Sequence, residues 1–278
     1  MTRHFIHFLR TDYVAAACLL IIVLVMFCAL TAPVLYLHDP NVSIGARNLP
    51  PAWDGALLGT DGDGRDILSR LIWGARFSLI TGIVPTFAAM VVAIVIGLVS
   101  ANIGGITDEI LMRCLDVLFA FPIVLVAIIV SGILSPGLVT IMIAIFIAEI
   151  PYLTKLCRTT AGVIIRQPYI EAARASGART LPLLVRYAMP NMLPTVLSYT
   201  TAIVGMMIVL GAGLNFLGLG IQPPQADWGS MVAEGRTVLR RAPHVTLFPG
   251  FAIVMIAVAF SMVGDGLRRL LDPRGAGR

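Results

Sequence analysis

Long apolar runs alternate with short polar segments along most of the chain, and all of these runs lack charged residues except the one that contains Glu149 and Lys155. The runs cover roughly residues 14–37, 77–107, 117–134, 138–157, 191–213 and 242–264. A helix needs about 20 predominantly apolar residues to cross the ~30 Å hydrocarbon core of a bilayer, and most of these runs reach that length. The pattern therefore predicts an all-α polytopic membrane protein with six transmembrane helices.

Two span boundaries depend on local residues. The first run, 14–37, is longer than the ~7–15 residues of a signal-peptide apolar region and has no clear small-residue cleavage site, so we expect a retained span. The uncharged stretch 117–148 is too long for one crossing. Ser135-Pro136-Gly137 interrupts it with turn-forming residues and separates the third span from the fourth.

Composition supports this class and excludes others. Hydrophobic residues make up 58% of the 278 positions and charged residues only 13%, whereas soluble domains carry about 25% charged residues. Mean hydropathy is +0.91, and the net charge of +5 comes from 19 arginines and the single Lys155. Because these basic residues cluster beside apolar spans, we interpret the charge as a topology signal. We expect contact with membrane lipid but not with nucleic acid.

A polar loop over residues 38–76 carries five aspartates and four arginines. Its second half predicts a glycine-rich turn and then an amphipathic helix within 65–76, because apolar and polar positions recur there at helical spacing. We expect this helix at the membrane interface, with Trp73 at headgroup depth. The aspartates do not make an EF-hand calcium loop, since the glutamate that would complete one is missing.

The stretch 166–190 is the only long polar and basic interruption in the second half of the chain, and it predicts two short helices. Pro168 suits the first position of a helix because it has no N–H to leave unpaired, and Gly177 suits the left-handed turn that ends one. A helix over 168–176 is only about 13 Å long, so it must lie outside the membrane. Its small side chains leave a low surface that another protein can approach closely.

The order of residues in this stretch is specific. It contains Glu171-Ala172-Ala173, then Gly177 after three residues, then an apolar-x-apolar-Pro string that ends at Pro190 after nine more. The combination resembles the EAA loop of ABC-importer permeases, although Tyr187 stands where isoleucine is common and Met189 where leucine is common. The resemblance implies a coupling helix that docks on an ATP-binding subunit. The residues assigned to this contact are Tyr169, Glu171, Ala172, Ala173, Arg174, Ser176, Gly177, Ala178 and Pro190.

Four further strings are similar to the C-type permease of dipeptide, oligopeptide and nickel importers. They lie at 59–79, 112–122, 216–229 and 264–274. The family resemblance is weakest in the first span. The resemblance implies the MetI-like fold of type I ABC-importer permeases.

The same resemblance implies three regions. Residues 1–76 are expected to hold the N-terminal span and a periplasmic loop with the amphipathic helix. Residues 77–268 are expected to form the core permease domain, with a cytoplasmic coupling loop at 158–190. Residues 269–278 are expected to form a cytoplasmic tail.

The family resemblance also implies partners in a bacterial inner membrane. These are a second permease subunit of the B type, two ATP-binding subunits and an extracytoplasmic substrate-binding protein. Peptide is the commonest substrate class of such permeases, and nickel chelates and glutathione are the alternatives. The sequence does not choose among them, because the binding protein largely sets selectivity and the residues expected to line the pathway are apolar.

The distribution of basic residues predicts the orientation. Six spans place both termini on one side of the membrane, and 13 of the 20 basic residues fall on that side. They are Arg3, Arg10, Arg113, Lys155, Arg158, Arg166, Arg174, Arg179, Arg186, Arg268, Arg269, Arg274 and Arg278. An excess of basic residues marks the cytoplasmic side, so both termini and the Glu171 loop are expected in the cytoplasm.

An ion-driven secondary transporter is the alternative from a different class. It would need buried ionisable groups near the membrane midplane and discontinuous helices in repeated halves. Asp116, Glu149 and Asp265 are instead expected near span ends. Glu149 falls inside the fourth span, where an ionisable group indicates a functional site, but pairing with Lys155 or Arg158 on the cytoplasmic side is the preferred interpretation. No clear internal repeat is visible, so the importer permease is preferred.

The sequence also argues against catalysis by this chain. A phosphate-binding loop requires Gly-Lys, whereas the only lysine, Lys155, follows Thr154. The H-E-x-x-H and G-x-S-x-G motifs are absent. The four cysteines lie in or beside apolar spans without C-x-x-C spacing, which is typical of packing residues. We therefore expect a non-catalytic subunit without cofactor or metal, with ATP bound by its partners.

Overall fold

A computed structural model describes residues 12–35, 37–52 and 55–271. Its elements are α2 (Tyr13–Thr31), α3 (Ile67–Ile103), α4 (Gly105–Phe119), α5 (Ile123–Leu134), α6 (Leu138–Ile165), α7 (Pro168–Ala175), α8 (Thr180–Leu183), a π-helical turn (Leu184–Ala188), α9 (Met189–Phe216), α10 (Trp228–Gly235) and α11 (His244–Leu271). Within the described ranges, β-type pairing is limited to two isolated bridges in the loop before α3 and at its start. The all-α class predicted from the sequence is confirmed.

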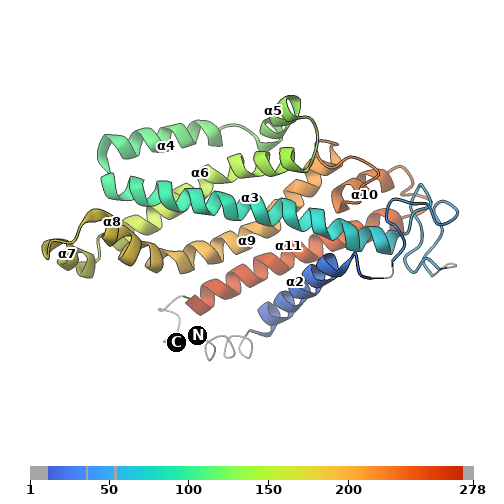
Figure 1. Ribbon diagram of the computed structural model, residues 1–278, viewed down its shortest axis with the longest axis horizontal. Coiled ribbons are helices and arrows are strands. Elements are labelled where there is room, and N and C mark those ends of the chain that lie inside the picture. Colours follow the sequence, from blue (N-terminus) through green and yellow to red (C-terminus); the bar gives the residue numbers. More distant parts are fainter. Residues whose placement is uncertain (1–11, 36, 53–54, 272–278) are drawn as a thin grey trace.

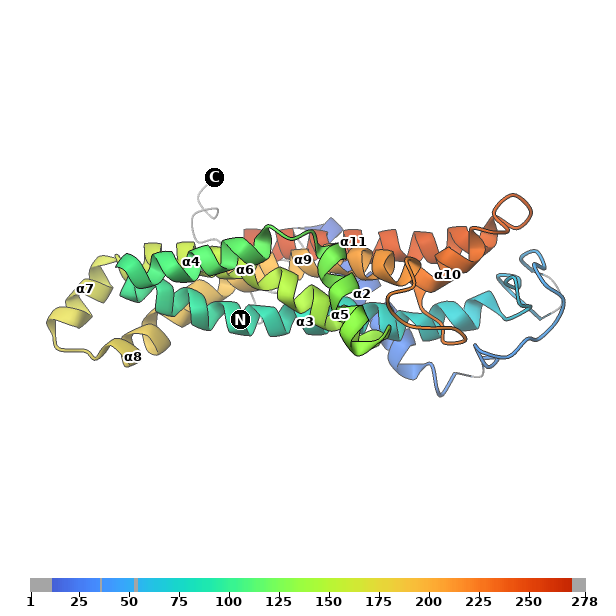
Figure 2. The ribbon, with the colours of Figure 1, turned by 90° about the horizontal axis from the view of Figure 1, so that it is seen from above.

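The long helices form an elongated bundle (Figure 1). Five of them are long and apolar enough to cross a membrane, and α4 and α5 together make a sixth candidate if the bent pair counts as one span. Helix α3 packs against α6 and α9, and α11 packs against α9 and α2. Figure 2 shows α7 and α8 at one end of the bundle, and α10 with the loop before α3 at the other.

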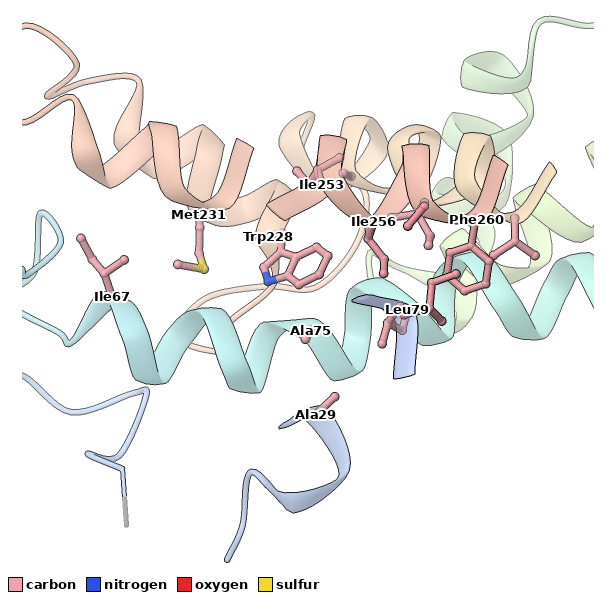
Figure 3. Close-up of a cluster of buried hydrophobic side chains, with 14 of the residues drawn as sticks. Ala29, Ile67, Ala75, Leu79, Trp228, Met231, Ile253, Ile256 and Phe260 are labelled. Atoms are coloured by element: carbon pink, nitrogen blue, oxygen red, sulfur yellow. The ribbon is translucent and has the colours of Figure 1, made fainter. Parts of the chain in front are cut away.

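A buried apolar cluster joins α2, α3, α10 and α11 near the end that carries α10 (Figure 3). Trp228, Ile256 and Phe260 belong to it and are buried. The Trp228 indole Nε1 also donates to the Leu71 carbonyl of α3 over 2.9 Å, which satisfies the polar atom of a large apolar side chain. This cluster fixes the short helix α10 against the spans.

The amphipathic helix predicted within 65–76 is not a separate interfacial element. Helix α3 begins at Ile67 and continues without a break for 37 residues to Ile103, and Asp66 caps it by accepting from the Ser69 N–H at 3.0 Å. The polar residues expected to face water are buried; Arg70 is 0% exposed. They face inward because they pair with charged side chains from other segments, which periodicity alone does not reveal.

The third span differs from the prediction in shape. The chain bends by 82° between α4 and α5, so the expected straight helix over 117–134 is two helices. Pro122 stands at the N-cap of α5, where its lack of an N–H ends the continuous hydrogen-bond ladder. On α4, Arg113 pairs with Glu109 over 3.8 Å, and Asp116 pairs with Lys155 of α6 over 2.6 Å.

The two ends of the described chain lie close together. Arg269 Nε donates to Asp12 Oδ2 over 3.1 Å, so the start of α2 and the end of α11 share one end of the bundle. That is also the end toward which α7 lies (Figure 1). Arg3, Arg10, Arg274 and Arg278, which contribute to the predicted orientation, lie outside the described residues, as does most of the predicted tail 269–278.

Candidate functional site

Helix α7 has the start and stop predicted for it. Pro168 occupies its first turn, after Gln167 in an extended conformation. Gly177 has φ +85°, a left-handed conformation that favours glycine, and its N–H donates to Arg174 O over 3.0 Å. The Ala178 N–H then donates to Ala173 O over 3.1 Å. These bonds satisfy the last carbonyls of α7 and turn the chain sharply toward α8.

Helix α7 presents most of the predicted docking residues to the outside. Ile170 is 0% exposed and anchors the helix to the rest of the protein. Ala173 is half-buried. The exposed predicted residues are Tyr169, Glu171, Ala172, Arg174, Ser176, Gly177 and Ala178. A Cβ atom at Gly177 would meet nothing within 4 Å, so this end of the molecule is open to a partner.

Pro190 lies apart from α7. The second predicted short helix is not isolated, because α8, the π-helical turn and α9 follow one another directly and form a single candidate span over Thr180–Phe216. Pro190 is exposed in the first turn of α9. Leu184 and Ala188 are buried in an apolar cluster with residues of α3 and α6. The loop is therefore connected rigidly to α9 on one side and to α6 on the other.

A cavity of about 430 Å³ opens in the half of the bundle built by α4, α5, α6 and α9. Its walls are mostly apolar. They are formed by Leu118, Phe119, Phe121, Ile123, Val126, Ile147, Ala148, Glu149, Tyr152, Ile203, Met206, Met207 and Leu210. The size falls within the usual range for small-molecule sites. Glu149 is the charged residue among these lining groups.

Glu149 is not satisfied in the way the sequence suggested. Lys155 Nζ lies 2.6 Å from Asp116 Oδ1, and Arg158 Nε donates to Asp108 Oδ1 over 2.6 Å. Both carboxylates come from α4, which packs alongside α6. Glu149 itself is 6% exposed, and its Oε2 atom has no hydrogen-bond partner. The expectation that Lys155 or Arg158 neutralises it is therefore wrong.

The opposite end of the bundle holds a buried charge cluster that sequence reasoning missed. Arg65 Nη2 and Arg70 Nη2 lie 2.7 and 3.1 Å from Glu234 Oε2, and Arg65 Nε lies 2.7 Å from Asp61 Oδ2. Burial raises the pKa of Glu234, while the charges of Arg70 and Arg65 act in the opposite direction. The 59–79 string thus carries residues that hold the loop, α3 and α10 together.

Two acidic residues of this loop pair with an arginine of the same loop. Asp61 and Asp63 bind Arg65. In the part of the chain that the structure describes, no group of three or more His, Cys, Asp or Glu side chains is arranged to hold a metal ion.

The Asp227-Trp228-Gly229 string also has a structural role. Asp227 caps α10 by accepting from the N–H groups of Gly229 and Ser230, and it accepts from Ser78 Oγ of α3 over 2.7 Å. Burial raises the pKa of Asp227, against the effect of these hydrogen bonds. The irregular segment before it buries Ile221 and Ala226 but leaves residues 222–225 exposed. It is not the wall of the cavity.

The comparisons with known proteins agree on one family. Residues 93–276 match the family described as "Binding-protein-dependent transport system inner membrane component". A glutathione transport system permease protein, GsiD, of Pectobacterium atrosepticum is 38% identical over 96% of this chain and 89% of its own. A di/tripeptide transport system permease protein, DppC, of Pseudomonas aeruginosa is 38% identical over 92% of this chain and 86% of its own.

Two further matches extend this result. A probable D,D-dipeptide transport system permease protein, DdpC, of Escherichia coli is 37% identical over 93% of this chain and 87% of its own. A chain of the MetNI methionine ABC transporter in an inward-facing conformation has a similar fold, with a TM-score of 0.60 over 74% of this chain and 98% of that chain, at 17% identity. The predicted fold and family are confirmed. The chain belongs to the family of binding-protein-dependent transport system inner membrane components, as a permease subunit of an ABC importer.

Proposed function

We propose that this permease moves peptides across the bacterial inner membrane, with α7 as the element that receives the force generated by ATP hydrolysis in its partners. The observation that carries the proposal is the geometry of α7, a short exposed helix that connects two spans. Its open, small-residue surface suits a groove on another protein. The names of the relatives, which refer to dipeptides, tripeptides and glutathione, support the substrate class.

The connections of α7 explain how force reaches the pathway. The chain enters α7 directly from α6, with the Gln167 N–H donating to Ile164 O over 3.0 Å, and leaves it through α8 into α9. Helices α6 and α9 both line the cavity, through residues such as Tyr152 and Met206. A push on α7 therefore moves two walls of the cavity together. Rigid-body rocking of this kind changes which side of the membrane the cavity faces.

The surfaces that this chain exposes indicate where its partner subunits bind. Helices α4 and α5 and the bend between them expose large apolar side chains beside the cavity, including Phe119, Phe121 and Ile129, which suits a second permease subunit that completes the pathway. Two ATP-binding subunits engage α7 and its counterpart. A substrate-binding protein delivers solute at the opposite end, near α10. Under this proposal the Asp12–Arg269 end of the bundle is cytoplasmic, in agreement with the excess of basic residues.

Reconstitution tests the proposal. The chain is incorporated into liposomes with its second permease, ATP-binding subunits and binding protein, and uptake of Ala-Ala, Ala-Ala-Ala and glutathione is measured with and without ATP. We expect saturable peptide uptake only with hydrolysable ATP. Equal uptake without nucleotide, driven by an ion gradient, would support the secondary transporter instead. Uptake of a nickel chelate in preference to every peptide would overturn the peptide assignment but not the coupling role of α7.

A further inference from the structure

The cavity between α4, α5, α6 and α9 contains an ionisable residue, Glu149, whose carboxylate is not paired by any residue that the structure describes. Glu149 is more than nine-tenths buried in its wall, and its Oε2 atom has no hydrogen-bond partner among the described residues. The surrounding walls are apolar except for Tyr152. A carboxyl group in such a place has lost its water without gaining a protein partner, which is unfavourable. The chemistry of the site therefore calls for a partner from outside this chain.

The basic residues that follow on the same helix do not provide that partner. Lys155 is held by Asp116 over 2.6 Å and stacks above the Phe119 ring at 5.0 Å. Arg158 is held by Asp108 through two hydrogen bonds. In the described part of the chain, no ion pair reaches Glu149. Releasing either cation would leave another carboxylate unpaired, so the chain gains nothing by rearranging.

We propose that Glu149 binds a primary ammonium group of the solute as it passes through the cavity. This rests on the proposed function and deepens it, because a peptide carries such a group at its N-terminus. An ammonium supplies three donors, and hydrogen bonds between charged groups strengthen where water is scarce. The Tyr152 hydroxyl, 3.2 Å from that of Tyr199, lines the same wall and can orient the group.

The size of the cavity favours a transient occupant. At about 430 Å³ it has room for a small peptide but is narrow for a peptide and a permanently inserted side chain together. A fixed arginine from the second permease would satisfy Glu149 but would also obstruct the path. A basic side chain from that subunit is therefore the competing occupant, and the experiment distinguishes it.

The test uses the assembled complex of both permeases and both ATP-binding subunits in lipid nanodiscs, without the binding protein and its own selectivity. Equilibrium binding of Ala-Ala-Ala is compared with that of N-acetyl-Ala-Ala-Ala, which lacks the ammonium. The variants are Glu149→Gln, Glu149→Asp and, as the matched control, Glu109→Gln on α4, which leaves the Lys155–Asp116 and Arg158–Asp108 pairs intact. The control also exchanges a carboxylate for an amide near this half of the bundle, but at a residue that does not line the cavity.

We expect the wild type and Glu109→Gln to bind the free peptide about tenfold more tightly than the acetylated one, as loss of one charge-assisted hydrogen bond predicts. Glu149→Gln should bind both peptides equally, and Glu149→Asp should recover part of the preference. An unchanged preference in Glu149→Gln, or none in the wild type, would overturn the inference. So would loss of the permease heterodimer in Glu149→Gln, since that outcome identifies Glu149 as an interface residue.

Failure of this inference and failure of the proposed function give different results. If ATP-dependent uptake of Ala-Ala-Ala occurs in liposomes but no ammonium preference is seen in nanodiscs, only the role of Glu149 is lost. If no peptide is taken up with ATP, the peptide function itself is lost.

Discussion

The guanidinium of Arg70 lies 3.1 Å from the carboxylate of Glu234, although 164 positions separate them in the chain. Arg70 is in the first turn of α3 and is 0% exposed, while Glu234 is near the end of α10. Arg65 contacts the same Glu234 oxygen at 2.7 Å. One carboxylate thus holds two buried cations and joins α10 to the loop before α3.

Replacing Glu234 with alanine should destabilise the protein, because it leaves the buried Arg70 with Asp61 Oδ2, 3.3 Å from its Nε, as its remaining carboxylate partner and Nη2 without one. Removing one partner of a buried pair costs about 3–5 kcal/mol, and we expect about 3 kcal/mol because part of the Glu234 side chain is exposed. Equilibrium unfolding in detergent micelles measures the change. Arg240→Ala, which removes an exposed charge just beyond α10, is the control and should be nearly neutral. Equal stability of both variants would contradict the role of the cluster.

These residues also show where sequence reasoning succeeds and where it stops. The apolar runs located the spans, and Pro168 and Gly177 located both ends of α7, because helix length, proline and glycine act locally. The pairing of Arg70 with Glu234 could not be predicted, since nothing near either residue encodes the other. Glu149 was assigned to Lys155 or Arg158 from sequence proximity alone, without knowing that the bend after α4 would bring other carboxylates beside α6.

Close packing at Gly229 gives a second prediction. A Cβ atom there would lie 2.3 Å from the Ala212 carbonyl oxygen of α9, a distance that requires the backbone to shift. Gly229→Ala should therefore destabilise the packing of α10 by about 1–3 kcal/mol. The matched control is Gly213→Ala, at a helical glycine of α9 that is exposed and whose Cβ would meet nothing within 4 Å. Alanine is the better helix former, so this control should be neutral or slightly stabilising in the same unfolding measurement.

Gly177→Asp should separate ATP hydrolysis from transport. The substitution places a charged side chain on the open end of α7, where it meets nothing in this chain but would meet a docked partner. The left-handed conformation at φ +85° makes the change cost about 1 kcal/mol, which the membrane-inserted protein can tolerate. We expect the variant to insert normally into the membrane and the ATP-binding subunits to keep hydrolysing ATP, while peptide uptake falls at least tenfold. Reconstituted uptake per ATP hydrolysed is the measurement.

Gly105→Asp is the matched control for this variant. Gly105 also has positive φ, at +59°, is exposed and has no neighbour within 4 Å of a Cβ atom, but it is the first residue of α4 and does not belong to α7. It should retain coupled uptake. Equal losses in the two variants would assign the defect to backbone strain, and full coupling in Gly177→Asp would count against α7 as the docking helix.

The anchor of α7 gives the last prediction. Ile170 is 0% exposed, whereas Leu181, a few residues later on α8, is 72% exposed. Ile170→Ala removes the contact that holds α7 against the bundle, so a push from a partner would displace α7 without moving α6 and α9. Because α7 lies at the end of the molecule, most of the large-to-small penalty of about 2–5 kcal/mol should appear as local loosening. We expect ATPase activity to persist while uptake per ATP falls several-fold, and Leu181→Ala to behave as the wild type. Hydrogen exchange over 168–178 should rise in Ile170→Ala alone; unchanged exchange with unchanged uptake would show that α7 does not need this anchor to transmit force.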